Sequence, residues 1–210
     1  MSEGTPSIRE RILDAAFSAF MRLGYSGAST SQIARLARVS KRDLYAHFGS
    51  KQAMLAGCVA ERAEHMRRPL ALPPPADRDG LRESLLHFGT AILRELGRPE
   101  VLATYRLAIV EAENALDVAV TLDRHGREAN REALTGLLTV SRERGLLTGE
   151  PGEIADLFLA VLLSGGILVR MLMRLATPPS EEEALRRAET ATHCLFRVHG
   201  TESERACIGG

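Results

Sequence analysis

The chain has 210 residues, of which 45% are hydrophobic and 26% charged, and its 27 basic side chains balance its 27 acidic ones. This apolar fraction is sufficient for a buried core, and the length suits one large domain or two small ones. The composition therefore predicts a soluble globular protein.

Targeting and metal-binding signals are absent from the sequence. The longest uncharged apolar run lies between Asp156 and Arg170 and has thirteen residues, whereas a helix needs roughly 20 to cross a bilayer. The first ten residues, MSEGTPSIRE, lack the basic segment and apolar core of a secretory signal. Cys58, Cys194 and Cys207 are widely separated, with no CxxC or Cys/His spacing. We expect a cytoplasmic protein with no membrane partner, no cofactor and no metal site.

Charge is distributed unevenly along the chain. Met1 to Leu55 contains eight Lys or Arg residues and four Asp or Glu residues, whereas the remainder contains 19 basic and 23 acidic residues. A basic segment joined to an acidic one points to nucleic acid as the partner of the basic segment only. The alternative is a basic face that is merely solvated.

The predicted elements are all helices, because apolar residues recur with periods near 3.6 and no stretch alternates with period two. Ser7 to Glu10 forms a capping box, and the apolar stripe that follows predicts a first helix ending at Gly24. A second helix is predicted to start after Thr30, as its N-cap, and to end near Ala37.

A third short helix is predicted after Ser40, whose capping partner is Asp43. Ser50 is expected to cap a fourth helix that ends near Met66, before a proline-rich loop at residues 73–75. Further helices are predicted at about 79–97, 100–112, 115–145, 152–175 and 181–198. The fold class is therefore predicted to be all-α.

The last two predicted helices suggest a dimer interface. The helix at 152–175 is apolar nearly all round and needs cover on every side, and the helix at 181–198 carries a narrow stripe of small and apolar residues. Two glycines inside the first of them, Gly165 and Gly166, indicate close approach or a kink. The alternative is that both helices complete the core of one chain. The residues predicted for the interface are Leu162, Gly166, Val169, Ala188 and Leu195.

Residues 29–51, STSQIARLARVSKRDLYAHFGSK, have the spacing of a helix-turn-helix motif. With Leu44 and Phe48 facing inward, the second motif helix presents Lys41, Arg42 and Tyr45 outward, with His47 at the flank. Arg42 is the preferred base reader, because a guanidinium binds guanine O6 and N7 in a bidentate fork. The alternatives are a solvated helix end for Lys41 and Arg42, and core packing for Tyr45.

Other residues of the motif are suited to phosphate contacts, which position a protein on DNA without reading its sequence. Tyr45 and His47 offer hydrogen-bond donors, and Lys51 offers an ammonium at the start of the fourth helix. Thr30 and the exposed amides of Ser31 and Gln32 are predicted to form a further anion site, and Ser31 is a candidate for the major groove.

The N-terminal stretch resembles the DNA-binding domain of TetR-family transcriptional regulators. The similarity covers about 50 residues in order, with matching residues from Arg11–Ala16 through Phe20, Gly24–Tyr25, Thr30, Ile33–Ala34, Val39–Ser40, Leu44–Tyr45, His47–Phe48 and Ser50–Lys51. The resemblance implies that Thr30, Tyr45, His47 and Lys51 clamp phosphates while Lys41 and Arg42 read bases. It also implies a helix-turn-helix domain at residues 1–50 and a helical ligand-binding and dimerisation domain at residues 51–210.

Two positions depart from the family pattern. Arg38 stands in the turn where the family usually has glycine, so either the turn is strained or Arg38 contacts a phosphate. Asp43 stands where a small or hydroxyl residue is usual. It could accept a hydrogen bond from cytosine N4 or cap its own helix.

Ligand-contacting residues are expected where a polar tip interrupts an apolar face of the later helices. For each candidate the alternative is an ordinary surface or core polar group. Because aromatic residues make up only 4% of the chain, we expect a small apolar or amphiphilic effector. The candidates are His87, Phe88, Tyr105, Arg106 and Glu111.

The sequence argues against an enzyme, because no histidine, cysteine or carboxylate pair has nucleophile-base or metal-ligand spacing and no phosphate loop is present. Neutral overall charge argues against a nonspecific DNA-binding protein, and a protein-interaction module is the remaining rival. We expect a sequence-specific, ligand-responsive repressor that binds double-stranded DNA as a homodimer. The helix from Ser50 to Met66 would act as the lever that separates the two recognition helices.

Overall fold

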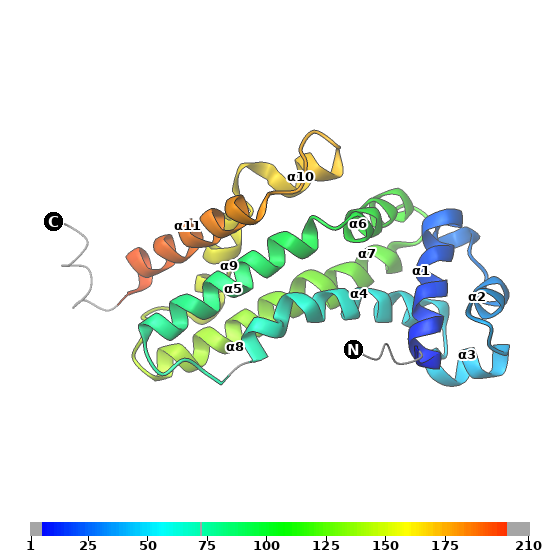
Figure 1. The fold of residues 1–210 in the computed structure, drawn as a ribbon, viewed down its shortest axis with the longest axis horizontal. Helices are drawn as coiled ribbons and strands as arrows, with labels where there is room; N and C mark the ends of the chain where they lie inside the picture. The colour runs from blue at the N-terminus through cyan, green and yellow to red at the C-terminus, as the bar shows by residue number, and fades with distance from the viewer. Residues whose placement is uncertain (1–5, 72, 201–210) are drawn as a thin grey trace. The chain divides into compact units, whose positions relative to one another are not determined.

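A computed structural model describes residues 6–71 and 73–200, and the elements in this part of the chain are all helical (Figure 1). The predicted all-α fold class is confirmed. Cys207 and the first half of the decapeptide MSEGTPSIRE lie outside the described residues. The helical residues divide into two compact units, which are described separately.

The first unit comprises residues up to Ala63 together with Ala103–Arg127. Its N-terminal helices are α1 (Ile8–Gly27), α2 (Thr30–Ala37), α3 (Lys41–Phe48) and the greater part of α4 (Lys51–Arg67). The second stretch contributes most of α6 (Pro99–Glu111), α7 (Leu116–Leu122) and most of the π-helical segment η2 (Asp123–Glu128).

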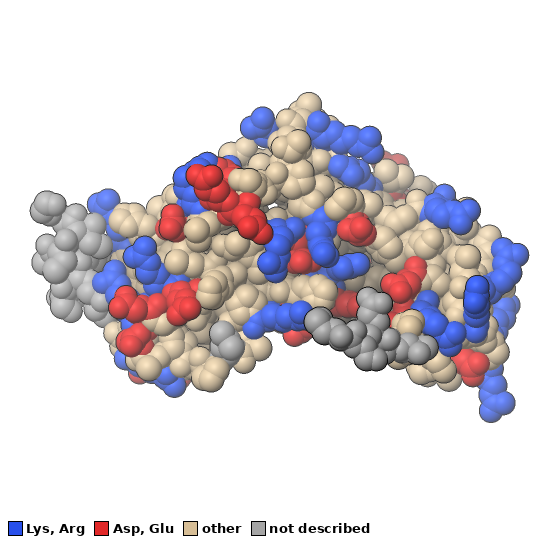
Figure 2. All heavy atoms as spheres, in the orientation of Figure 1, with Lys and Arg blue, Asp and Glu red and all other residues tan. Residues whose placement is uncertain are grey.

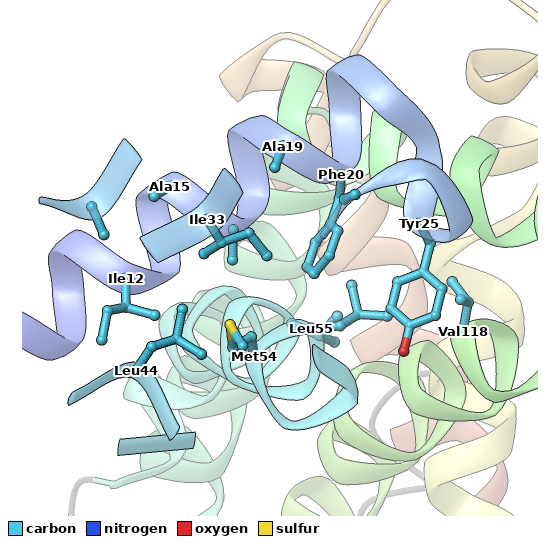
Figure 3. Close-up of a cluster of buried hydrophobic side chains, with 14 of the residues drawn as sticks. Ile12, Ala15, Ala19, Phe20, Tyr25, Ile33, Leu44, Met54, Leu55 and Val118 are labelled. Carbon is cyan, nitrogen blue, oxygen red and sulfur yellow. The ribbon is translucent and has the colours of Figure 1, made fainter. Parts of the chain in front are cut away.

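One apolar cluster joins these helices (Figure 3). Ile12 and Phe20 of α1, Ile33 of α2 and Leu44 of α3 are all fully buried. The cluster extends along α4 and reaches α7, adding Met54, Leu55, Val59, Ala108, Val118 and Leu122. The compact unit thus reaches beyond the predicted division between residues 50 and 51, because the first turns of α4 and the α6–α7 segment pack into the same core. The division itself stays a prediction about function.

Side-chain caps place most helix starts where the sequence predicts them. Ser7 caps α1 and Ser40 caps α3, each with its capping-box partner three residues later, and the Ser50 hydroxyl accepts the amide of Ala53 at 3.0 Å. The predicted N-cap of α2 is wrong by one residue. Ser29 forms the capping box with Gln32, and Thr30 is the first helical residue.

The predicted end of α1 at Gly24 is also corrected. Gly24 has a φ of 75° and a ψ of 165°, which interrupts the helix, but helical structure resumes and extends to Gly27. Glycine adopts this region at little cost, whereas other residues do not. The glycine therefore marks a break inside α1, after which Tyr25 turns into the core with 6% exposure.

The second unit comprises Glu64–Leu102 and residues from Glu128 onward. It contains the end of α4, the short 3₁₀ segment η1 (Arg68–Ala71), α5 (Arg78–Leu96), α8 (Ala129–Glu143), α9 (Pro151–Leu162), η3 (Ser164–Gly166), α10 (Ile167–Leu172) and α11 (Glu181–His199). α11 packs against α5 and α9, and α9 packs against α8. The helix predicted at 115–145 is three consecutive segments, α7, η2 and α8.

The helix predicted at 152–175 is broken. Gly165 and Gly166 have φ values of 71° and 66°, so α9 ends and α10 begins in a new direction, which confirms the expected kink. Arg187 of α11 donates to the Ser164 carbonyl at 3.1 Å beside this break.

The predicted dimer interface is corrected for three residues. Leu162, Ala188 and Leu195 are fully buried inside the second unit, because their stripes face the neighbouring helices of the same chain. The alternative of a monomer core is therefore correct for these three. Gly166 is exposed and Val169 keeps 57% exposure, so the prediction stays open for that pair.

Residues Pro151–Leu172 form a 22-residue segment long and apolar enough to cross a membrane, and an 18-residue window within it has a mean hydropathy of 2.0. The sequence analysis counted only the thirteen uncharged residues between Asp156 and Arg170 and expected no membrane span. The segment found here is longer because it includes both of these charged residues. The break at η3 leaves 12 residues in α9 and 6 in α10, both short of the roughly 20 that a bilayer needs. The buried face of α9 covers the core of the second unit.

Candidate nucleic-acid interface

Two short helices, α2 and α3, and the turn between them form the predicted motif. The turn starts at Arg38, which has a φ of 53° and a ψ of 47°. Its amide hydrogen-bonds the Arg35 carbonyl at 3.2 Å, and the amide of Val39 hydrogen-bonds the Ala34 carbonyl at 3.0 Å. The left-handed conformation costs a residue with a Cβ roughly 1–2 kcal/mol. This favours the strained-turn explanation for the arginine at this position.

The inner faces of the motif hold it on α1. Ile33, Ala34 and Ala37 of α2 and Leu44 of α3 are buried, as the sequence predicts. Phe48 is only half-buried, and the Arg9 guanidinium lies 5.6 Å from its ring centroid. The orientation of α3 therefore depends chiefly on Leu44.

The outer face of α3 carries the predicted DNA-contacting residues. Lys41, Arg42 and His47 are exposed, and Tyr45 is 47% exposed, which excludes core packing for Tyr45. Ser31 of α2 is exposed as well. Figure 2 shows Lys and Arg side chains along the outer edge of α2 and α3. These side chains are therefore accessible from outside the first unit.

Tyr45 links the two motif helices. Its hydroxyl lies 3.2 Å from the Thr30 hydroxyl, at hydrogen-bonding distance. Two predicted phosphate ligands from α2 and α3 are therefore adjacent, so that one anion can contact both. The pair lies at the start of α2, where the Gln32 amide already donates to the Ser29 hydroxyl at 3.2 Å, so the anion site there stays a prediction for Thr30, Tyr45 and the Ser31 amide.

Asp43 acts as a helix cap. Its carboxylate accepts hydrogen bonds from the Ser40 hydroxyl at 2.7 Å and the Ser40 amide at 3.3 Å. The Ser40 hydroxyl, followed by the amide, lowers the pKa of Asp43. The capping explanation therefore accounts for this departure from the family pattern.

Lys51 is held by the end of α1. Its Nζ donates to the carbonyls of Tyr25 at 2.8 Å and Ala28 at 3.2 Å, and it lies 4.4 Å from the Tyr25 ring centroid. The ammonium thus fixes the connection between α1 and α2, a role that the sequence analysis missed. A phosphate contact by Lys51 stays a prediction, and it would use the one remaining ammonium proton.

A second polar network joins the end of α1 to α6 and α7. Glu111, the last residue of α6, accepts hydrogen bonds from the Ser26 hydroxyl at 2.7 Å and the Ser26 amide at 3.2 Å. The Tyr25 hydroxyl donates to Asp117 of α7 at 3.1 Å. Burial, followed by the Asp117 charge, raises the pKa of Tyr25 to about 12. A Cβ at Gly24 would lie 3.0 Å from Oε1 of Glu111, so glycine permits this close approach.

Glu111 was a predicted ligand contact, and the structure shows it paired with a neighbouring residue, which was the alternative. The carboxylate is only 9% exposed and is engaged with Ser26, because the end of α6 packs on the break in α1. The sequence separation of 85 residues hid this pair.

Replacing Glu111 with glutamine is expected to reduce stability at neutral pH. The Ser26 hydroxyl and amide hold the pKa of Glu111 below its ordinary value of 4.5, so the carboxylate contributes stability above that value and loses it as the pH falls through the lower folded pKa. The stability deficit of Glu111→Gln should therefore be constant at neutral pH and shrink below pH 4.5. Urea denaturation at several pH values measures it.

The control is Glu113→Gln, a change at an exposed residue of the loop that follows α6. It should alter stability little at any pH. A Glu111→Gln deficit that grows on acidification would contradict the assigned role.

The other predicted ligand contacts do not form one cluster within either unit. Phe88 is fully buried in the second unit and stacks on Phe158 with 6.4 Å between ring centroids, whereas His87 next to it is exposed. Tyr105 and Arg106 are half-buried in the first unit, where burial raises the pKa of Tyr105. Helical neighbours in sequence point in different directions, which separates His87 from Phe88.

Comparisons with known proteins agree with this geometry. Residues 12–58 match the profile of bacterial regulatory proteins of the tetR family. Residues 83–201 match the C-terminal domain profile of AefR-like transcriptional repressors. Together the two matches include the helix-turn-helix motif and more than half of the chain.

Individual proteins are similar over most of the chain. The HTH-type transcriptional regulator YvkB of Bacillus subtilis (strain 168) is 27% identical over 155 residues, which are 73% of this chain and 78% of YvkB. A TetR transcriptional regulator of Agrobacterium tumefaciens has a crystal structure with a TM-score of 0.76 and 26% identity, covering 96% of this chain and 99% of that one. The flavonoid-responsive regulator FrrA has a TM-score of 0.73 and 26% identity, covering 93% and 98%.

Proposed function

The chain belongs to the TetR family of bacterial regulatory proteins, and from this membership we propose that it is a cytoplasmic, ligand-responsive repressor that binds a palindromic operator as a homodimer. It is a transcriptional regulator and not an enzyme. Residues 1–50 bind DNA in this proposal, and residues 51–210 bind the effector and form the dimer.

The main support for DNA binding is the exposed face of α3. Lys41 and Arg42 lie in the first turn, where a recognition helix meets base edges. Tyr45 and Thr30 form the adjacent hydroxyl pair, which suits one phosphate. The remaining phosphate contacts are assigned to Ser31, His47 and Lys51.

Selection of bound sites from random duplexes tests the function. A homodimer sets its recognition helices roughly 34–36 Å apart, in successive major grooves on one side of the duplex. The selected sequences should therefore share two half-sites related by two-fold symmetry. Selected pools without a shared sequence would favour nonspecific binding or a protein-interaction role, and they would contradict the proposal.

The proposed dimer surface is the apolar face that the second unit leaves uncovered. Val169, Met173 and Leu175 on and after α10 are 57–63% exposed, and Leu185 and Val198 of α11 are 44% and 52% exposed. Exposed apolar side chains on α10 and α11 are candidates for an interface between chains. The Ser164–Gly166 break presents this face by turning α10 away from α9.

Replacing Val169 with aspartate is expected to weaken dimerisation by at least about tenfold, because an unpaired carboxylate loses hydration when the partner covers it. Sedimentation equilibrium at several protein concentrations measures the dissociation constant. The matched control is Val110→Asp, at a valine of α6 that is 76% exposed and lies in the first unit. If both variants dimerise as the wild type does, this surface is not the interface.

The effector is proposed to be a small, largely apolar molecule. FrrA is named as a flavonoid-responsive regulator, so hydroxylated aromatic compounds are a reasonable first class to test. Binding to the C-terminal helices would shift an equilibrium between two conformations, with α4 as the lever. Lys51 at the start of α4 and Glu111 at the end of α6 both hold residues 25–28, and they offer the route by which such a shift reaches the motif.

A further inference from the structure

Arg9 places a positive charge in the first turn of α1, where the helix itself gains nothing from it. Arg9 is the second residue of α1, and its side chain is exposed. The amide dipoles already give this end of a helix a positive potential, so a cation there is unfavourable. The carboxylate of the neighbouring Glu10 caps α1 by accepting the Ser7 amide at 2.7 Å. Among residues 6–71 and 73–200, none forms a hydrogen bond or an ion pair with the Arg9 guanidinium.

The Arg9 side chain reaches the C-terminal end of α3. Its guanidinium lies over the ring of Phe48, the last residue of α3, at 5.6 Å from the centroid. Phe48 packs against the core of the first unit, where a Cβ at Gly57 of α4 would lie only 3.2 Å from Cε1 of the ring. The core therefore holds the ring in place, and the ring holds the guanidinium by a cation–π contact. That contact uses the face of the guanidinium and leaves its N–H donors available.

The phosphate contacts proposed at this end of α3 have little positive charge of their own. His47, the residue before Phe48, is exposed and offers a hydrogen-bond donor. The Lys51 ammonium already donates to two backbone carbonyls of residues 25–28, at 2.8 and 3.2 Å, so one of its three protons is left for a phosphate. Arg9 brings a full charge to the same end of α3, with donors that no described residue occupies.

We infer that Arg9 contacts DNA, and that its guanidinium, held over Phe48, binds a backbone phosphate at the C-terminal end of α3. This inference rests on the proposed DNA binding by α3. It adds a cation from α1, outside the helix-turn-helix motif, to the contacts proposed for His47 and Lys51. A guanidinium suits this role because two of its N–H groups match two phosphate oxygens. Phosphates are the same in every sequence, so Arg9 adds affinity without sequence preference.

The test measures how the DNA affinity of the full chain depends on salt. Arg9→Gln removes the charge and keeps the Ser7–Glu10 capping box. Fluorescence anisotropy is recorded with the selected operator and with a scrambled duplex at several salt concentrations. At one fixed salt concentration, both affinities should fall by at least about tenfold. The slope of log K against log salt should become shallower by about 2, because each phosphate contact contributes about 0.9 and a dimer makes the contact twice.

Two further variants separate charge from other effects. Arg9→Lys keeps the charge and should keep the wild-type slope. Arg22→Gln removes a charge at an exposed position of the same helix, roughly 20 Å further along it, and should match the wild type in affinity and slope.

Three outcomes would overturn the inference. A loss of affinity in Arg9→Gln with an unchanged slope would mean that Arg9 positions α3 without touching a phosphate. An unchanged affinity, or a loss confined to the selected operator, would contradict the contact directly. The preference of the wild type for the selected operator over the scrambled duplex reports separately on the proposed function. If that preference is present while Arg9→Gln behaves as the wild type, only the inference fails. If it is absent while the slope changes as expected, only the proposed sequence-specific function fails.

Discussion

Replacing Leu44 with alanine is expected to lower the free energy of unfolding by about 2–5 kcal/mol, the range for removing a large aliphatic side chain from a packed core. Leu44 is fully buried and is the one buried residue of α3. Figure 3 shows it beside Ile12 in the core of the first unit. No other fully buried side chain of α3 can take over this anchor, so DNA binding should fall together with stability.

Urea denaturation followed by circular dichroism measures this loss. Leu36→Ala on α2 is the matched control, because Leu36 is 45% exposed and surface changes usually stay within about 0.5 kcal/mol. Equal effects of the two substitutions would show that α3 is not held by its inward leucine, and the geometry of the candidate interface would then be wrong.

Arg42→Ala is expected to weaken operator binding by roughly 5- to 150-fold for each half-site, because a bidentate contact to guanine contributes about 1–3 kcal/mol of discrimination. A symmetric dimer makes the contact twice, so the combined loss should be at least about 25-fold. Arg42 is exposed in the first turn of α3, and its replacement should leave the fold intact. Fluorescence anisotropy at one fixed salt concentration, with the selected operator and a scrambled duplex, measures the change.

Sequence preference distinguishes the assigned roles. Arg42→Ala should affect the selected operator far more than the scrambled duplex, whereas Tyr45→Phe should weaken both to a similar extent, because it removes a phosphate donor together with its link to Thr30. Arg22→Ala, at an exposed position of α1, is the control for general loss of positive charge. Equal losses on the two duplexes for Arg42→Ala would contradict base reading.

Local patterns predicted the motif well. Ser7 and Ser40 start their helices as the capping boxes indicate, and the period of buried residues in α2 and α3 places Lys41 and Arg42 outside. Such features depend on residues three or four positions apart, which a helix brings together whatever the rest of the chain does. The one-residue error at Ser29 and Thr30 arose because both side chains are competent N-caps.

Patterns could not predict which partner covers a face. The stripe of Ala188 and Leu195 suggested a second chain, yet the same chain buries it against α5 and α9. An apolar pattern of helical period predicts that one face of a helix is buried. It does not predict whether the same chain or a second chain buries that face. For the same reason Phe88 qualified as a ligand contact, although it fills the core beside Phe158.

The amino-acid order was enough to establish the all-helical class, the helix-turn-helix motif and the side of α3 that faces outward, because these depend on interactions within a few turns of one helix. The folded chain alone decided that Glu111 and Lys51 hold the end of α1, that Arg9 lies over Phe48 at the end of α3, and that Val169 rather than Leu162 stays exposed. Those outcomes depend on pairs of residues far apart in sequence, whose meeting is set by the packing of whole helices.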